Sequence, residues 1–338
     1  MKEVPLFSIC ITSYNRVNEL YRCLNSIDAI HSKDIEIVIS EDCSPMKDEI
    51  RQVVRKFISE TDYKVRYNSN IENIGYDQNL GKLISLASGN YILFISDDDM
   101  FLKGGIDKLI KATKKHDFFV AFTPYFHQKT GIMGREYSKT FVIERGFRGV
   151  KKHLFDSILF SGLIFKRDKV IDYQPKRFKN LIYSQVYLFC TMLLKGDGLY
   201  INIPLINCIE DGENAFGLNE SGESNKVMAN RESPLSNLEY HKSLIKIINI
   251  FDGENKTNLI NIFSKEYSIR SYTGMSIARK SSLAVLKSYW KAMGRINIKI
   301  HPIAYIYYFM LLVLGYRLSD FILYLPKSFL LLVRHSFK

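Results

Sequence analysis

The sequence lacks the patterns that identify several common classes of protein. Its five cysteines form no C-x-x-C pair and leave one thiol over, which indicates free thiols in a reducing cytoplasm rather than a disulfide framework. Neither G-x-G-x-x-G nor G-x-x-x-x-G-K-[S/T] occurs, so the dinucleotide-binding and P-loop motifs are excluded. We expect no signal peptide, because Pro5 interrupts the short apolar run at the N-terminus.

Acidic residues are fewer than basic ones. The chain has 35 Asp and Glu against 47 Lys and Arg, which gives a formal net charge of +12. This excess indicates an anionic partner: a nucleic acid, a membrane surface or a phosphorylated substrate. The basic residues are spread along the chain instead of forming a stripe with stacking aromatic rings, so we expect no nucleic-acid partner. With 338 residues, the chain is long enough for about two domains.

Short apolar runs alternate with helical periodicity over the first hundred residues. The predicted strands are 6–11, 35–39, 64–67 and 91–95, and the predicted helices are 20–27, 50–58 and 80–87. This alternation predicts right-handed crossovers and a mostly parallel sheet. Polar groups follow three of the strands, at 12–16, 41–42 and 97–99. Because ligands gather at the carboxyl ends of parallel strands, we expect these groups to converge on one crevice. Farther along, 183–194 predicts a helix and 199–206 a strand.

Three adjacent aspartates, Asp97, Asp98 and Asp99, directly follow the fourth predicted strand. Neighbouring carboxylates raise each other's pKa and need a positive partner. The stretch lacks the alternating oxygen ligands and central glycine of an EF-hand, and acids at such a place are often only turn or capping residues. Their clustering at a strand end favours a hard divalent cation, Mn²⁺ or Mg²⁺. Such a cation can bridge a diphosphate and neutralise the charge that develops as it leaves.

Four ordered stretches carry a family resemblance: SICITSYNR, IEIVISEDCS, NIENIGYDQNL and SGNYILFISDDDM. Together they resemble the motifs of family 2 glycosyltransferases, and the last two are similar to abequosyltransferase-like enzymes of O-antigen and polysaccharide synthesis. The likeness covers residues 6–110 and extends more loosely to about 215. It implies an α/β fold of the GT-A type, a Rossmann-like and mostly parallel sheet over residues 1–217, followed by a helical C-terminal region, 218–338.

The resemblance also implies a reaction and a set of site residues. The reaction is transfer of a hexose-type sugar from a nucleotide-diphosphate-sugar donor to a glycan acceptor, with Mn²⁺ or Mg²⁺ as cofactor. The residues implied to bind the donor are Thr12, Ser13, Tyr14, Arg16, Glu41, Asp42, Asn73, Gly75, Asn79, Asp97 and Asp98. The acidic motif aligns either as D-x-D-D from Ser96 or as D-x-D from Asp97. Both alignments include Asp99, which is therefore the first metal ligand, with Asp97 or Asp98 as a second.

The resemblance does not place a catalytic base. Inverting members carry an acid at the start of the helix after the acceptor loop, but here that helix begins with Ser184 and Gln185, which cannot act as bases near neutral pH. The candidates in the sequence are Glu210, Asp211 and Glu213, with Asp172 as a further one. A solvated acidic turn is the alternative for the loop that contains the first three. A retaining mechanism, which needs no such base, stays open.

The C-terminal part of the sequence is apolar and basic. Residues 303–314 are almost wholly apolar and 321–333 nearly so, yet neither run reaches the roughly 18 residues of a membrane-spanning helix. Lys and Arg punctuate both runs, and Asp320 is the acid among them. The runs are either core helices or helices that lie on an anionic membrane leaflet, and their dense aromatic residues favour the second interpretation. We therefore expect a lipid-linked acceptor and a cytoplasmic protein, peripheral at the inner face of the cell membrane.

Two other functions compete with glycosyl transfer. A sugar-phosphate nucleotidyltransferase uses a related fold and metal, but the sequence lacks a glycine-rich, basic loop for a triphosphate near its N-terminus. A non-catalytic basic module that binds membranes or nucleic acid would use the positive charge alone. Lys166 and Arg167 either contact a diphosphate or are simply exposed, so they do not distinguish among these functions.

Overall fold

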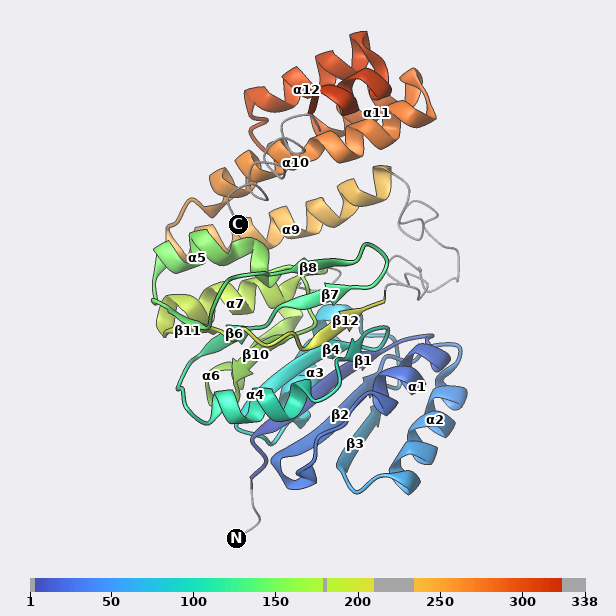
Figure 1. The fold of residues 1–338 in the computed structure, drawn as a ribbon, viewed down its shortest axis with the longest axis vertical. Coiled ribbons are helices and arrows are strands. Elements are labelled where there is room, and N and C mark those ends of the chain that lie inside the picture. Colours follow the sequence, from blue (N-terminus) through green and yellow to red (C-terminus); the bar gives the residue numbers. More distant parts are fainter. Residues whose placement is uncertain (1–3, 179–180, 210–233, 324–338) are drawn as a thin grey trace, which may run out of the picture. The chain divides into compact units, whose positions relative to one another are not determined.

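The computed structural model describes residues 4–178, 181–209 and 234–323 (Figure 1). The chain divides into two compact units, Met1–Ala215 and Phe216–Lys338. The first unit contains a mixed sheet and its covering helices, and the second is helical over its described residues.

The first unit is built on an eight-stranded sheet of order β3-β2-β1-β4-β10-β6-β11-β9. Four parallel strands form one half: β1 (Phe7–Ser13), β2 (Ile35–Glu41), β3 (Lys64–Ser69) and β4 (Tyr91–Ser96). The helices between them are α1 (Val17–Asn25), α2 (Lys47–Glu60) and α3 (Tyr76–Leu86). The predicted alternation and the parallel sheet are confirmed. In the sheet, β2 lies on one side of β1 and β4 on the other. The topological switch point therefore lies between the carboxyl ends of β1 and β4.

The other half of the sheet is mixed. It consists of β6 (Val120–Phe122), β9 (Phe141–Ile143), β10 (Leu163–Lys166) and β11 (Gly198–Tyr200), and β10 runs antiparallel to β4 and β6. A second sheet of order β5-β12-β7-β8 contains β5 (Met100–Phe101), β7 (Tyr125–His127), β8 (Ile132–Gly134) and β12 (Ile206–Cys208). The remaining helices are α4 (Gly105–Thr113), α5 (Phe147–His153), α6 (Arg167–Val170) and α7 (Ser184–Lys195).

One predicted strand was wrong. Residues 199–206 do not form a single strand, because β11 belongs to the first sheet and β12 to the second. Pro204 lies between the two strands, and a proline has no N–H to give to a continuous ladder. The helix predicted over 183–194 is confirmed as α7.

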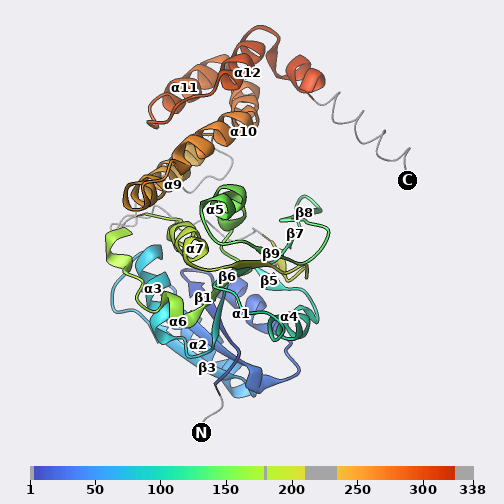
Figure 2. The ribbon, with the colours of Figure 1, turned by 90° about the vertical axis from the view of Figure 1, so that its left-hand side faces the viewer.

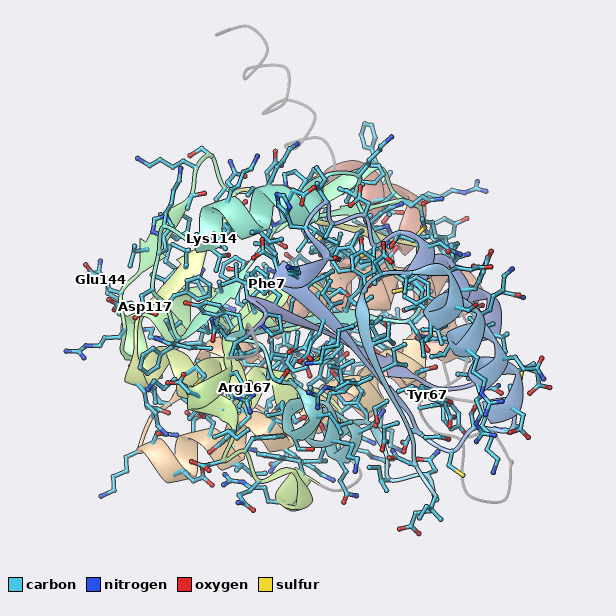
Figure 3. The ribbon with its side chains drawn as sticks, turned by 90° about the horizontal axis from the view of Figure 1, so that it is seen from below. Phe7, Tyr67, Lys114, Asp117, Glu144 and Arg167 are labelled. Atoms are coloured by element: carbon cyan, nitrogen blue, oxygen red, sulfur yellow. The ribbon has the colours of Figure 1, made fainter. Side chains whose placement is uncertain are left out.

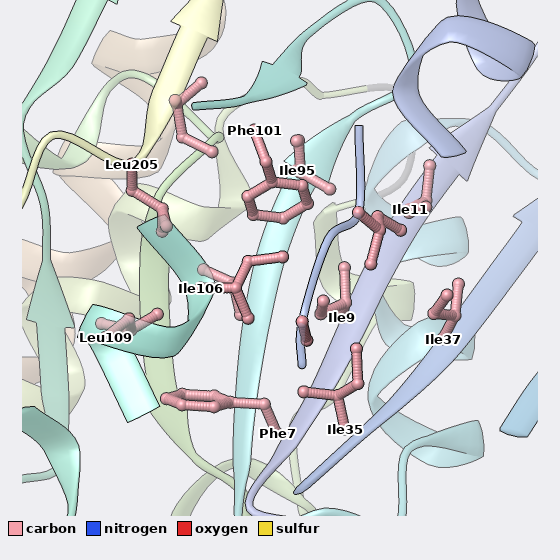
Figure 4. Close-up of a cluster of buried hydrophobic side chains, with 14 of the residues drawn as sticks. Phe7, Ile9, Ile11, Ile35, Ile37, Ile95, Phe101, Ile106, Leu109 and Leu205 are labelled. Atoms are coloured by element: carbon pink, nitrogen blue, oxygen red, sulfur yellow. The ribbon is translucent and has the colours of Figure 1, made fainter. Parts of the chain in front are cut away.

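The core of the first unit forms around the central strands (Figure 4). Ile9 of β1 and Ile37 of β2 are fully buried, as is Ile106 of α4. Every residue of β2 is buried, as expected for a parallel strand that is covered on both faces. This packing holds the strand ends in place, so the polar turns that follow them have a rigid base.

The second unit contains α9 (Pro234–Asn255), α10 (Leu259–Ser281), α11 (Leu283–Met293) and α12 (Pro302–Val313). The other three helices pack against α10 (Figures 1 and 2). Gly274 of α10 makes room for the ring of Tyr289, since a Cβ there would lie 2.3 Å from its hydroxyl. Among the described residues, no helix is both long and apolar enough to cross a membrane. Most of the predicted apolar run 321–333 lies outside the described residues.

Candidate functional site

Arg16 joins the turn after β1 to the acidic triplet after β4. Thr12 of β1 lies opposite Ser96 of β4, so both polar turns leave the sheet at the same edge. The guanidinium Nη1 of Arg16 lies 2.8 Å from Asp97 Oδ1 and 3.1 Å from Asp98 Oδ2. All three aspartates are at most 6% exposed. The triplet therefore has a positive partner within the protein itself, one that sequence analysis did not identify.

Burial shifts the pKa values of both Arg16 and Asp97. Burial raises the pKa of Asp97 to about 7, against the opposing charge of Arg16 and with the help of its neighbour Asp98. Burial lowers the pKa of Arg16, but the carboxylates of Asp97 and Asp98 outweigh it and raise that pKa above its ordinary value. The backbone N–H of Tyr14 also donates to Asp97 at 3.2 Å. Arg16 thus stays charged at every physiological pH.

Asp99 is oriented by a different loop. Its Oδ2 accepts a hydrogen bond from the hydroxyl of Ser161, and that hydroxyl accepts one from the N–H of Ser96 at 3.0 Å. The buried guanidinium of Arg135 donates to the carbonyl of Ser161 at 2.9 Å. Gly162 follows with φ +81, and a Cβ there would lie 2.7 Å from a threonine hydroxyl. The sequence signal for this loop was the Ser-Gly pair directly before β10.

Glu41 and Asp42, at the end of β2, face different neighbours. Glu41 is fully buried and accepts hydrogen bonds from the N–H of Ser44 at 2.6 Å and from the hydroxyl of Ser69 at 3.0 Å. Asp42 accepts from the N–H groups of Ile74 and Gly75, both at 2.9 Å. Burial raises the pKa of Asp42, although these donors oppose the shift. Glu41 thus closes its own turn, whereas Asp42 ties β2 to the segment that leads into α3.

That segment places its two asparagines on the same edge of the sheet. Gly75 has φ +80 directly before α3, a conformation that favours glycine. Asn73 accepts from the N–H of Gly75 at 3.0 Å, and its side chain forms a hydrogen bond with the phenol of Tyr14. Asn79 donates to the carbonyl of Ser40 at 3.0 Å. The structure therefore brings together the polar groups that follow β1, β2 and β4, as the strand-end argument predicted.

Ser13 completes the turn after β1. Its carbonyl accepts from the N–H of Asp42 at 3.0 Å. Its hydroxyl is buried and finds no hydrogen-bond partner among the described residues. A buried hydroxyl without a partner is costly unless a ligand or water completes it, so Ser13 is consistent with a binding edge.

The predicted catalytic residues Glu210, Asp211 and Glu213 lie outside the described residues. Asp172 is exposed after α6. The helix α7 begins with Ser184 as expected, and a carboxylate that sequence analysis missed lies against it. Asp77 of α3 is 2% exposed, its Oδ1 accepts from the N–H of Ser184 at 3.2 Å, and burial raises its pKa to about 7. The available signal was an acid two residues after Gly75, in the first turn of a helix.

Lys166 and Arg167 lie at the opposite end of the sheet. Lys166 pairs in register with Tyr91, the first residue of β4, and its ammonium lies 2.6 Å from Asp117. Arg167 donates to the carbonyl of Ala87 at 2.8 Å. Figure 3 views the chain from this side and labels Phe7, Asp117 and Arg167. We call the edge of the sheet that carries Asp97, Asp98 and Asp99 the acidic edge. Because Lys166 and Arg167 lie at the opposite end, the structure excludes their contact with a diphosphate bound there.

The acidic edge fits only one kind of metal site. The described residues contain no group of three or more His, Cys, Asp or Glu that could hold a metal. An all-protein cage is therefore absent from this part of the chain. Mg²⁺ and Mn²⁺ instead take one or two carboxylates and complete their shell with phosphate oxygens and water. Asp99, with Asp97 or Asp98 beside it, matches that requirement.

Comparison with known proteins agrees with this geometry. Residues 8–172 match the model of the family described as glycosyl transferase family 2. The GalNAc(5)-diNAcBac-PP-undecaprenol beta-1,3-glucosyltransferase of Campylobacter jejuni is 27% identical over 201 residues, 59% of this chain and 63% of that protein. The abequosyltransferase RfbV of Salmonella typhimurium is 33% identical over 103 residues, 30% of each. The chain thus spans less than two thirds of the length of either relative.

Solved structures confirm the predicted GT-A fold. Staphylococcus aureus TarS 1-349 in complex with UDP-GlcNAc has a TM-score of 0.57 and 17% identity, and the match covers 86% of this chain and 80% of that one. The mannosyltransferase PcManGT from Pyrobaculum calidifontis, in complex with GDP-Man and Mn²⁺, has a TM-score of 0.53 and 12% identity, with 94% and 82% covered. At these identities the likeness is one of fold alone.

Proposed function

We propose that the chain transfers a sugar from a nucleotide-diphosphate donor to a glycan acceptor, because its residues 8–172 match the model of glycosyl transferase family 2. The observation that carries this proposal is the convergence of three strand ends on one edge. Asp42 reaches Gly75, Tyr14 reaches Asn73, and Arg16 reaches Asp97. In an open α/β sheet, this edge at the switch point is where ligands bind.

The donor would lie along this edge. The turn 12–16 and the segment 73–79 supply backbone and side-chain hydrogen-bonding groups for a base and a ribose, among them the hydroxyl of Ser13. Asp42 holds the second segment in place through two backbone N–H groups. Arg16 contributes a fixed positive charge beside the acidic triplet, where a diphosphate would bring further negative charge. Glu41 shapes its turn from inside, since Ser44 and Ser69 already engage its carboxylate.

Asp99 is the proposed ligand of a divalent cation, Mn²⁺ or Mg²⁺, with Asp97 or Asp98 as the second. When bound, the cation would neutralise charge on the departing nucleoside diphosphate. Two other residues of the chain already contact these carboxylates. Ser161 fixes one oxygen of Asp99, and Arg16 compensates the charge of the two preceding carboxylates.

In the transfer step, an acceptor hydroxyl attacks the anomeric carbon, and the bond from that carbon to the diphosphate oxygen breaks. The hydroxyl proton passes to a base of the chain. We propose that the base is one of Glu210, Asp211 and Glu213. Asp77 of α3 is a further candidate, since its pKa of about 7 suits a base at neutral pH and it lies against the start of α7.

The proposed acceptor is a glycan on a lipid-linked oligosaccharide in the synthesis of a surface polysaccharide. The name of the Campylobacter relative includes a PP-undecaprenol carrier, which supports this choice. An acceptor anchored in a bilayer requires an enzyme that reaches the membrane. We therefore place the chain in the cytoplasm, peripheral at the inner face of the cell membrane.

A donor screen tests this function. The thermal shift of the full chain is measured with UDP-, GDP-, CDP- and dTDP-sugars, each with and without Mn²⁺. A ligand that binds only the folded chain raises the apparent melting temperature, so one nucleotide should stand out, and more strongly with the metal. The selected donor should then release its nucleoside diphosphate in the presence of acceptor. Release of pyrophosphate from a nucleoside triphosphate and a sugar phosphate would instead identify a nucleotidyltransferase.

A further inference from the structure

The second unit carries a concentrated apolar surface. Six large apolar side chains of α12 and of the helical residues 315–323 are each more than half exposed: Tyr305, Ile306, Phe309, Val313, Leu318 and Phe321. We call the four of these residues that belong to α12, Tyr305, Ile306, Phe309 and Val313, the α12 surface. Tyr305, Phe309 and Val313 recur every four residues and so share one face of the helix. Of the 20 exposed large hydrophobic residues of the described chain, eight lie between 305 and 322, so the patch differs from the usual scatter.

The opposite side of α12 is packed, so the exposed side chains stand on a supported helix. Ala304 and Leu311 are fully buried. The ring of Tyr308 stacks on Trp290 of α11 with centroids 4.6 Å apart, and α12 packs along α10 (Figures 1 and 2). Arg279 of α10 donates to the carbonyl of Leu311 at 3.0 Å. The α12 surface is therefore held in its exposed orientation by the helices beneath it.

The charge along this part of the chain is mostly positive, and Arg270 is paired with Glu266 at 3.6 Å. Between residues 270 and 323 there are eight Lys and Arg against one acid. The basic residues are Arg270, Arg279, Lys280, Lys287, Lys291, Arg295, Lys299 and Arg317. The acid, Asp320, is itself engaged: it accepts from Tyr272 at 2.7 Å and lies 3.6 Å from Lys280. This part of the unit thus combines exposed apolar side chains with an excess of basic residues, among them the exposed Lys287 and Lys291 of α11.

We propose that the α12 surface docks on a bilayer that contains anionic phospholipid. Exposed aromatic and aliphatic side chains flanked by Lys and Arg are the features with which a helix lies in the membrane interface. Basic residues near such a surface attract it to anionic lipid headgroups. A second copy of the chain is a poorer partner, because two such faces would bring positive charge against positive charge. The proposal rests on the second unit alone and does not depend on the transfer reaction.

Co-sedimentation of the full chain with vesicles tests the proposal. The chain should bind vesicles of phosphatidylcholine with phosphatidylglycerol, and bind phosphatidylcholine alone at least tenfold more weakly. The double variant Phe309→Ser, Val313→Ser should lower binding to the anionic vesicles about tenfold or more, because two apolar side chains no longer enter the interface. The matched control is Ile30→Ser, Ile71→Ser, which changes two exposed apolar residues of the first unit and should leave binding unchanged.

A second pair of variants tests the charge. Lys287→Gln, Lys291→Gln should weaken binding to anionic vesicles on the order of tenfold, and added salt should reduce that difference. Lys103→Gln, Lys115→Gln, exposed in the first unit, is the control. Wild-type binding by the Phe309→Ser, Val313→Ser variant would overturn the proposal. So would a wild-type dimer in light scattering that this variant dissociates, since the surface would then join two copies.

Discussion

Arg16 and Asp97 meet across the switch point of the sheet, 2.8 Å apart and 81 residues apart in sequence. Each comes from the turn that follows a central parallel strand. Their contact means that the acidic edge is already partly compensated before any ligand arrives. Removing Arg16 therefore leaves the buried carboxylates of Asp97 and Asp98 without this cation, which is the costly way to break such a pair.

Replacing Arg16 should test this relationship directly. Arg16→Ala is expected to lower the free energy of unfolding by about 3 kcal/mol, because Asp97 and Asp98 remain buried without their cation. Arg16→Lys keeps the charge but loses the planar fork, so its loss should be smaller. Chemical denaturation measures both. The control is Arg51→Ala, which breaks an exposed pair with Asp48 and should change stability by less than about 0.5 kcal/mol. Equal effects of Arg16→Ala and Arg51→Ala would contradict the assignment.

Replacing Asp99 should separate chemistry from folding. Asp99→Ala is expected to reduce transfer by at least about a hundredfold while the melting temperature stays within a few degrees, because a cation ligand is lost. The thermal shift produced by donor with Mn²⁺ should also fall. Asp168→Ala, which removes an exposed carboxylate, should leave turnover unchanged. Normal turnover in Asp99→Ala would exclude Asp99 as a metal ligand.

Ser161 is expected to act through Asp99. Ser161→Ala removes the hydroxyl donor to Asp99 and leaves the N–H of Ser96 without its acceptor. The Mn²⁺ concentration for half-maximal transfer should rise severalfold, since the carboxylate is no longer held, and stability should fall by about 1–3 kcal/mol. Ser157→Ala is a matched control, because Ser157 is equally buried but donates to the carbonyl of Leu154. An unchanged metal requirement in Ser161→Ala would show that the contact is only structural.

Asp77 should make stability depend on pH. Burial raises its pKa to about 7, so between about pH 4 and 7 the folded chain binds a proton that the unfolded chain has lost. Its contribution to stability is therefore complete below pH 4 and is lost as pH rises through 7. Asp77→Asn removes the buried charge and should stabilise the protein at pH 8 by a few kcal/mol, at most about 4.

Urea denaturation at pH 5 and pH 8 measures this effect. The difference between Asp77→Asn and the wild type should be larger at pH 8. Asp62→Asn, at an exposed site, should show no such difference between the two pH values. A difference for Asp77→Asn that is independent of pH would mean that the carboxyl has the same protonation state at pH 5 and pH 8, which would contradict a pKa of about 7.

The catalytic base can be found by single substitutions. Among Glu210→Gln, Asp211→Asn and Glu213→Gln, one should lower kcat by about 10²–10⁴ without reducing the thermal shift given by the donor. The other two serve as its controls, since they change neighbouring charges in the same stretch. If none has this effect, Asp77→Asn is the next variant. Normal kcat in all four would leave a mechanism that needs no such base.

The local pattern of the sequence determined the parallel half of the sheet in the first unit. Strand and helix periodicities are properties of neighbouring residues, so β1 to β4 and α1 to α3 could be predicted without knowledge of their partners. The carboxyl ends of parallel strands lie at one edge of a sheet. This rule was enough to predict that Arg16, Asp42 and Asp99 lie at the same edge. The wrong strand over 199–206 had the same local origin, because an apolar run does not say to which sheet each half belongs.

The tertiary structure decided the contacts within the site. Arg16 meets Asp97, Ser161 meets Asp99 and Asp77 meets the start of α7 across 81, 62 and 107 residues of sequence. No local pattern encodes these pairs, because each depends on how strands and helices pack. The exposed face of α12 is similar: the sequence shows that the run is apolar, but only packing decides which side chains remain outside. The sequence by itself therefore determined which residues gather at the edge, and the fold decided which of them compensate one another's charge.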